Sequence, residues 1–179
     1  MKPYNIGLCG FGGQGIILTA VVLGTTVVTK GNRYAVQTQS YGSEARGGQC
    51  QAELIISDNP INATSSEQKD ILIALFQSAL DKYLPTLKEE GTLIIDPKLV
   101  KVPAGYEDRT IEVPATEMAV TLGNRLVANM ILLGYMQQRF NLFSKEDLIE
   151  VVKESVPEKY INLNIKAIHE GIAYAKKES

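Results

Sequence analysis

A glycine-rich turn directly after a short apolar run is the feature of this sequence that most limits its fold. Residues 4–9 predict a buried strand, the stretch GFGGQG occupies residues 10–15, and residues 16–29 predict an apolar helix. Glycine lets a strand turn sharply into a helix, so this order predicts the opening half of a βα unit. The start of such a helix also presents backbone N–H groups that can hold an anion.

Two further strands are expected close together after this unit. Residues 33–39 and 51–56 are rich in β-forming residues, and a short polar segment separates them. A parallel crossover needs a dozen or more residues for its helix, so these strands are predicted to be antiparallel neighbours.

The middle of the chain predicts a second unit with parallel strands. Residues 70–75 and 91–96 are apolar runs typical of buried strands, and the stretch 76–90 between them predicts a helix. A last short strand is expected at residues 110–113, and the chain after Pro114 predicts only helices.

The helical C-terminal region carries its own signals. Ser144 and Asp147 form a capping pattern at a helix start. Isoleucines at 161, 165, 168 and 172 recur at helical spacing and form an apolar stripe. This stripe is expected to pack on the sheet of the same domain, with a partner subunit as the alternative.

Length and composition indicate one soluble domain over residues 1–179. The chain is 45% hydrophobic and 21% charged, with a net charge of -2, which gives no basic surface for nucleic acid or an anionic membrane. No apolar run approaches the roughly 18 residues of a membrane span, so a cytoplasmic protein is expected. Cys9 and Cys50 lie 41 positions apart without any CxxC motif, so no metal or iron-sulfur site is predicted in this chain.

The glycine turn is a candidate phosphate site, although not for NAD. Gly10, Gly12 and Gly15 match the pattern G-x-G-x-x-G, but a dinucleotide site also needs an acidic residue at the end of the second strand. The stretch 37–40 is QTQS, and no lysine of a P-loop follows the glycines. The alternative is a turn that only lets the helix pack closely on the strand. Gln14 is unusual there, because its side-chain amide can form hydrogen bonds in two directions.

The polar loop from Ser40 to Gly48 is the second candidate. It gathers Tyr41, Glu44 and Arg46 between glycines, and an arginine can bind a phosphate or carboxylate with two hydrogen bonds. The alternative is that Arg46 only orders the loop by contacting Glu44 or the backbone.

Residues for catalysis are scarce. His169 is the single histidine and is expected on the surface of the C-terminal helix, and no nucleophile is paired with a base at recognisable spacing. The chain is therefore predicted to perform no bond chemistry by itself.

Three motifs in order carry a resemblance to a known family. GFGGQG, the stretch TQSYGSEARGGQCQAELIIS at residues 38–57 and the stretch PATEMAVTLGNRLVANMILLG at residues 114–134 resemble the gamma subunit of 2-oxoacid:ferredoxin oxidoreductases, most closely the 2-oxoglutarate type. Ser43 departs from the pattern, because proline is expected there. The resemblance implies a Rossmann-like three-layer α/β/α sandwich with a mixed, mostly parallel sheet.

The resemblance also implies a multi-subunit enzyme that oxidatively decarboxylates a 2-oxoacid, forms an acyl-coenzyme A and reduces ferredoxin. Thiamine diphosphate and iron-sulfur clusters are then held by alpha and beta subunits and a ferredoxin-like delta subunit, while the gamma subunit helps to accommodate coenzyme A and binds no cofactor alone. The residues implied for binding are Gly10, Gly12, Gly13, Gln14, Gly15, Tyr41, Glu44 and Arg46, with Gly42, Gly47 and Gly48 in the loop.

Two alternatives stay open at this stage. The chain could be the corresponding subunit of an indolepyruvate or pyruvate enzyme, because the choice of acid is made mostly in other subunits. It could also be an independent nucleotide-binding module, against which the missing acidic residue of the second strand argues.

Overall fold

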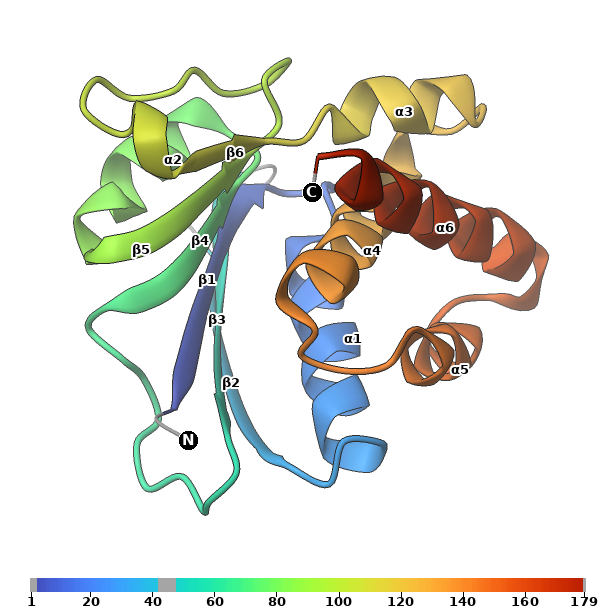
Figure 1. Cartoon of the computed structure of the whole chain (residues 1–179), viewed down its shortest axis with the longest axis horizontal. Helices are drawn as coiled ribbons and strands as arrows, with labels where there is room; N and C mark the ends of the chain where they lie inside the picture. Colours follow the sequence, from blue (N-terminus) through green and yellow to red (C-terminus); the bar gives the residue numbers. More distant parts are fainter. Residues whose placement is uncertain (1–2, 42–47, 179) are drawn as a thin grey trace.

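A six-stranded sheet forms the centre of the computed structural model, which describes residues 3–41 and 48–178 (Figure 1). The strand order is β2-β3-β1-β4-β5-β6. The strands are β1 (Tyr4–Phe11), β2 (Tyr34–Tyr41), β3 (Gln49–Ser57), β4 (Lys69–Ala74), β5 (Leu87–Ile95) and β6 (Thr110–Glu112).

The sheet is mixed and mostly parallel, as predicted. β1, β4, β5 and β6 run parallel to one another, whereas β3 pairs antiparallel with both β1 and β2. The predicted antiparallel pairing of the second and third strands is therefore confirmed, and all eight residues of β2 have a partner on β3. In addition, β3 separates β2 from β1, so the first two strands of the chain are not neighbours.

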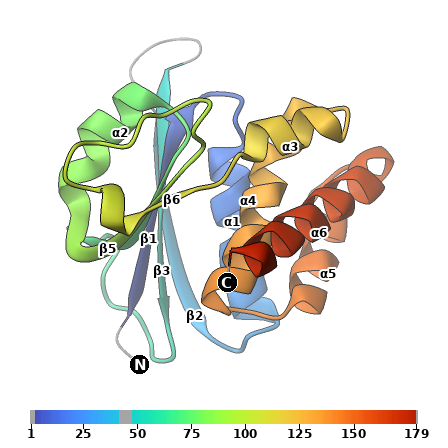
Figure 2. The same ribbon diagram turned by 45° about the horizontal axis from the view of Figure 1, so that its top comes forward.

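Helices cover the two faces of this sheet unequally. They are α1 (Ile16–Thr29), α2 (Gln77–Tyr83), α3 (Ala115–Thr121), α4 (Ala128–Phe140), α5 (Lys145–Ser155) and α6 (Ile161–Lys177), with short 3-10 turns η1 (Leu84–Thr86), η2 (Glu107–Arg109), η3 (Arg125–Val127) and η4 (Glu158–Tyr160). α2 lies on one face, and α1 lies on the other with α3 to α6 (Figure 2). This arrangement confirms the three-layer α/β/α fold and the helical C-terminal region.

Alternating residues of the strands fill a separate core on each face. Leu8 and Ile73 are buried in the larger core beneath α1 and α4, whereas Cys9 and Leu72 are buried in the smaller core beneath α2. A strand buried on both faces reads as a continuous apolar run, which is why the central strands were recognisable in the sequence.

The isoleucine stripe of the last helix packs differently from the prediction. Ile168 and Ile172 are buried within this chain, but α6 lies against α4 and not on the sheet. A Cβ atom at Gly171 would lie 1.9 Å from the Ile131 carbonyl oxygen, and one at Gly134 would lie 2.1 Å from the Ile168 carbonyl oxygen. The two helices therefore touch backbone to backbone through one glycine from each.

The predicted helix over residues 76–90 is wrong in its second half. α2 ends at Tyr83, and residues 87–90 already belong to β5. Pro85 explains this end, because proline has no backbone N–H to donate the next helical hydrogen bond. Leu87 is then buried in the smaller core, which offsets the helical preference of the following Lys-Glu-Glu.

Two smaller expectations hold. The Ser144 hydroxyl accepts a hydrogen bond of 3.0 Å from the Asp147 backbone N–H at the start of α5, and His169 lies exposed on α6. Within residues 3–41 and 48–178, no helix is both long and apolar enough to cross a membrane.

Candidate functional site

The glycine turn joins β1 to α1 and needs glycine at defined positions. Gly13 and Gly15 have φ values of 95° and 75°, a region that side chains with a Cβ rarely adopt. A Cβ at Gly15 would also lie 2.4 Å from the Asn129 amide nitrogen on α4. No side chain caps the start of α1, and its first turn contains no acidic residue. The first N–H groups of α1 therefore present the positive end of the helix dipole beside the turn.

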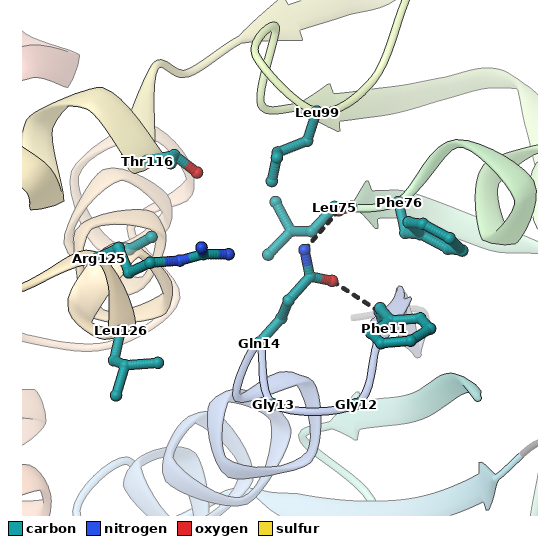
Figure 3. A pocket seen from close by; sticks show the side chains of 11 residues that line it. Phe11, Gly12, Gly13, Gln14, Leu75, Phe76, Leu99, Thr116, Arg125 and Leu126 are labelled. Carbon is teal, nitrogen blue, oxygen red and sulfur yellow. Dashed lines mark hydrogen bonds between the residues drawn. The ribbon is translucent and has the colours of Figure 1, made fainter. Parts of the chain in front are cut away.

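Gln14 connects two strands through both ends of its amide. Its Oε1 accepts a hydrogen bond of 2.6 Å from the Phe11 backbone N–H, and its Nε2 donates one of 2.7 Å to the Leu75 carbonyl oxygen (Figure 3). A Cβ at Gly10 would approach Oε1 to 2.6 Å, so glycine there leaves room for the amide. The predicted bidirectional hydrogen bonding is confirmed, and it fixes the carboxyl end of β1 against that of β4.

The turn lies at the point of the sheet where chain connections diverge. β1 and β4 are parallel neighbours, and the helices that follow them, α1 and α2, lie on opposite faces. In open α/β sheets, ligands bind in the crevice at the carboxyl ends of such a strand pair.

A pocket of about 580 Å³ occupies this crevice, within the size range of small-molecule sites (Figure 3). The β1 and β4 side is contributed by the glycine turn and by an aromatic pair, Phe11 and Phe76, whose ring centroids lie 5.1 Å apart. The full lining is Phe11, Gly12, Gly13, Gln14, Leu75, Phe76, Leu99, Thr116, Arg125, Leu126 and Ala128.

The opposite wall is held in place by a buried carboxylate. Asp96, at the end of β5, is fully buried and accepts hydrogen bonds from the backbone N–H groups of Lys98 at 3.0 Å and Thr116 at 2.7 Å. The Asp96 carboxylate thereby ties the loop after β5 to the first turn of α3. Both segments contribute to the pocket, through Leu99 and Thr116 respectively.

Arg125 supplies the positive charge of the pocket. It lies on η3, and its guanidinium points across the cavity toward Gln14 and Leu75 (Figure 3). The side chain of Asn124 caps this turn by accepting a 3.0 Å hydrogen bond from the Leu126 backbone N–H. Among the described residues, no carboxylate lies within ion-pair distance of Arg125. The guanidinium and the glycine turn thus face each other across the pocket, an arrangement suited to an anion.

The structure brings some predicted site residues together and leaves others apart. Gly12, Gly13 and Gln14 line the pocket, while Gly10 and Gly15 support the turn. Tyr41 is 65% exposed at the end of β2 and is absent from the pocket lining. Glu44 and Arg46 lie outside the described residues, as do Gly42 and Gly47. A ligand-binding role for these residues stays a prediction.

Sequence reasoning missed Arg125, Thr116 and the aromatic pair. Phe11 lies within the glycine turn itself, but Phe76, Thr116 and Arg125 come from segments more than 60 positions after it, and only the fold brings them to the same pocket. The stretch around Arg125 was noticed for its resemblance to the family, but nothing in its local pattern indicates a cavity.

The cysteines are unsuited to nucleophilic or metal chemistry. Burial raises the pKa of the Cys9 thiol to about 12 and also raises that of Cys50, so both stay protonated at neutral pH. Both thiols are free, and they belong to the cores on opposite faces of the sheet. Over residues 3–41 and 48–178, no group of three histidine, cysteine or acidic side chains is arranged to hold a metal ion.

These features define a class: a Rossmann-like α/β protein with an anion-suited pocket at its strand switch point. The chain belongs to the family described as pyruvate ferredoxin/flavodoxin oxidoreductase, whose sequence pattern matches residues 5–174.

The relatives within this family indicate which kind of oxidoreductase subunit the chain is similar to. The chain is 41% identical over 176 residues to the 2-oxoglutarate synthase subunit KorC of Methanocaldococcus jannaschii, covering 97% of this chain and 94% of that protein. It is 38% identical, with a TM-score of 0.86, to the gamma subunit of a keto/oxoacid ferredoxin oxidoreductase from Geobacter sulfurreducens, covering 99% of this chain and 98% of that one.

A third match shows the same fold within a longer chain. The 2-oxoglutarate:ferredoxin oxidoreductase from Magnetococcus marinus, solved with 2-oxoglutarate, coenzyme A and succinyl-CoA bound, aligns with a TM-score of 0.88 at 21% identity. The alignment covers 99% of this chain and 32% of that one.

Proposed function

We propose that this protein is the gamma subunit of a 2-oxoglutarate:ferredoxin oxidoreductase, with a single gamma-type domain over residues 1–179, and that it contributes to coenzyme A binding. The 41% identity to a 2-oxoglutarate synthase subunit over nearly the whole of both chains supports this choice over an indolepyruvate or pyruvate enzyme. The complex decarboxylates a 2-oxoacid oxidatively, transfers the acyl group to coenzyme A and delivers electrons to ferredoxin in the cytoplasm.

The reaction centres belong to other subunits in this proposal. An iron-sulfur cluster needs several cysteine thiolates, and the two cysteines of this chain are buried in separate cores. Alpha and beta subunits then bind thiamine diphosphate, and a ferredoxin-like delta subunit carries clusters. This chain positions a substrate and does not perform the bond chemistry alone.

The observation that carries the coenzyme A assignment is the pocket in which Arg125 faces the glycine turn. Coenzyme A presents a pyrophosphate and a ribose phosphate, and both groups suit a guanidinium and an open helix start. The apolar rings of Phe11 and Phe76 and the side chain of Leu126 leave the rest of the cavity suited to the less polar parts of the molecule.

The topology argues against NAD as the ligand. In a dinucleotide-binding fold, the second strand lies beside the first and parallel to it, and its end carries the acid that binds the ribose hydroxyls. Here the antiparallel strand β3 occupies that place, with Cys50 opposite Gly10. Among the described residues, no parallel second strand therefore ends beside the glycine turn to carry a ribose-binding carboxylate, which weakens the alternative of an independent NAD-binding module.

Titration calorimetry with coenzyme A and, in parallel, NAD tests the proposal. Removing a charged hydrogen-bond partner costs about 1.5–3 kcal/mol, so Arg125→Ala is expected to weaken coenzyme A binding roughly tenfold or more. Arg139→Ala is the matched control, because Arg139 is an exposed arginine on α4 that does not line this pocket. NAD binding of comparable affinity, or coenzyme A binding that is indifferent to Arg125→Ala, would contradict the assignment.

A further inference from the structure

Strand β2 lacks the features that normally keep an edge strand from pairing with another chain. It ends the sheet, and its sequence YAVQTQSY contains no charge, proline or glycine over eight residues. Protected edges are typically short or carry lysine, proline or a bulge. The opposite edge is of that kind, because β6 has three residues and includes Glu112. β2 can therefore accept a further strand.

The helix beside this edge is also uncharged on its exposed side. The 14 residues of α1 include no charged residue, and Val21 and Val28, two helical turns apart, are 40% and 44% exposed. Together with Ala35 of β2 and Leu54 of β3 they line a groove of about 290 Å³. Thr25, Thr29 and Gln37 also line it, so the flank is uncharged rather than wholly apolar. A surface helix normally carries charged residues on its solvent side, and their absence makes this flank unusual.

The nearest cations are paired within the chain itself. Lys30, just after α1, lies 2.7 Å from a Glu150 carboxylate oxygen, and Arg33, just before β2, lies 2.9 Å from one of Asp58. Two identical copies of this flank can therefore meet without bringing like, unpaired charges together. This charge pattern favours a second copy of the chain as the occupant.

We propose that β2 and the outer side of α1 form the interface of a symmetric dimer of this chain. The two β2 strands pair antiparallel across a two-fold axis perpendicular to the sheet, which extends the sheet through both copies. That axis places both α1 helices on the same face.

The spacing of the elements fits this arrangement. α1 packs over β2 and β3, so its axis lies about half a strand spacing inside the edge. With neighbouring strands about 4.8 Å apart, the two α1 axes come to lie about 10 Å apart, within the usual range for packed helices. Val21 of one copy then faces Val28 of the other, and the groove beside each edge is filled by the opposite helix.

Size-exclusion chromatography with light scattering on the full chain tests the dimer. The wild-type protein is expected to have twice the chain mass of 19.6 kDa. Val21→Lys places a charged side chain against Val28 of the other copy and is expected to raise the dimer dissociation constant at least about tenfold, because burying an unpaired charge against an apolar surface is unfavourable. Lysine favours a helix at least as well as valine, so the fold is expected to survive, and circular dichroism checks it.

Val120→Lys is the matched control, since Val120 is a 57% exposed valine on α3, outside the proposed interface. Retention of the dimer in this variant and its loss in Val21→Lys and Val28→Lys would support the interface. A wild-type protein that stays monomeric at about 100 μM, or a dimer that Val21→Lys and Val120→Lys affect equally, would overturn it. The coenzyme A pocket lies at the carboxyl ends of β1 and β4, so its calorimetric test can succeed or fail separately.

Discussion

The backbone contact between α4 and α6 predicts that Gly171→Ala destabilises the protein. The added Cβ would lie 1.9 Å from the Ile131 carbonyl oxygen and 2.9 Å from the Tyr135 backbone nitrogen, whereas ordinary contact begins at 3.4 Å. Neither neighbour is a movable side chain, so the helices must separate by about 1.5 Å or distort. That shift loosens the packing of Ile168 and Tyr135, which are 0% and 1% exposed.

Two opposing effects set the size of the change. Alanine is favoured over glycine within a helix by about 1 kcal/mol, while overpacking a rigid interface costs about 1–3 kcal/mol and sometimes more. Because this clash involves backbone on both sides, we expect overpacking to exceed the helical gain, with a net loss of roughly 2 kcal/mol in the free energy of unfolding. Urea denaturation followed by far-ultraviolet circular dichroism measures it.

Ala173→Gly, at an exposed position two residues further along α6, calibrates the helical preference in the same helix. This control is expected to lose about 1 kcal/mol. If Gly171→Ala instead gained stability of that size, the close approach of the two backbones would be refuted.

Two other perturbations test the site and the C-terminal region. Gln14→Ala removes the link between Phe11 and Leu75 and is expected to lower the free energy of unfolding by about 1–2 kcal/mol. The midpoint of urea denaturation measures this loss, and an unchanged midpoint would count against the link. Burial raises the pKa of the Tyr135 hydroxyl, and so does the 2.9 Å hydrogen bond that this hydroxyl donates to Glu178. As the pH rises, the unfolded chain therefore loses this proton first, near pH 10, and the free energy of unfolding is expected to fall as the pH rises further. Tyr135→Phe should make that alkaline fall shallower in a series of melting temperatures, and an identical profile would argue against the assignment.

Local sequence patterns were sufficient to predict elements that are set by short, local signals. The apolar runs of β1, β4 and β5 are buried on both faces, and the glycine turn fits one type of strand-to-helix connection, so both were predictable. The first turn of α5 was equally legible, because the Ser144 cap acts within four residues.

Features that depend on distant contacts were not predictable in the same way. The residues 87–90 favour a helix locally, yet Pro85 ends α2, and burial of Leu87 in the smaller core favours β5 there instead. The stripe of α6 indicated burial but not that its partner is α4. Arg125 became recognisable as a site residue only when η3 was placed across from the glycine turn.

The position of β1 inside the sheet has a consequence for how the chain is synthesised. β1 is paired with both β3 and β4, which follow it in the chain, so its two neighbours are complete only after residue 74 has been synthesised. At about 5–20 residues per second, the apolar strand waits for several seconds before both of its edges are satisfied. α1 is synthesised in that interval and can pack against one face of β1 before the other strands form. Because α1 directly follows β1 in the chain, we expect it to be the earliest cover for this strand during synthesis.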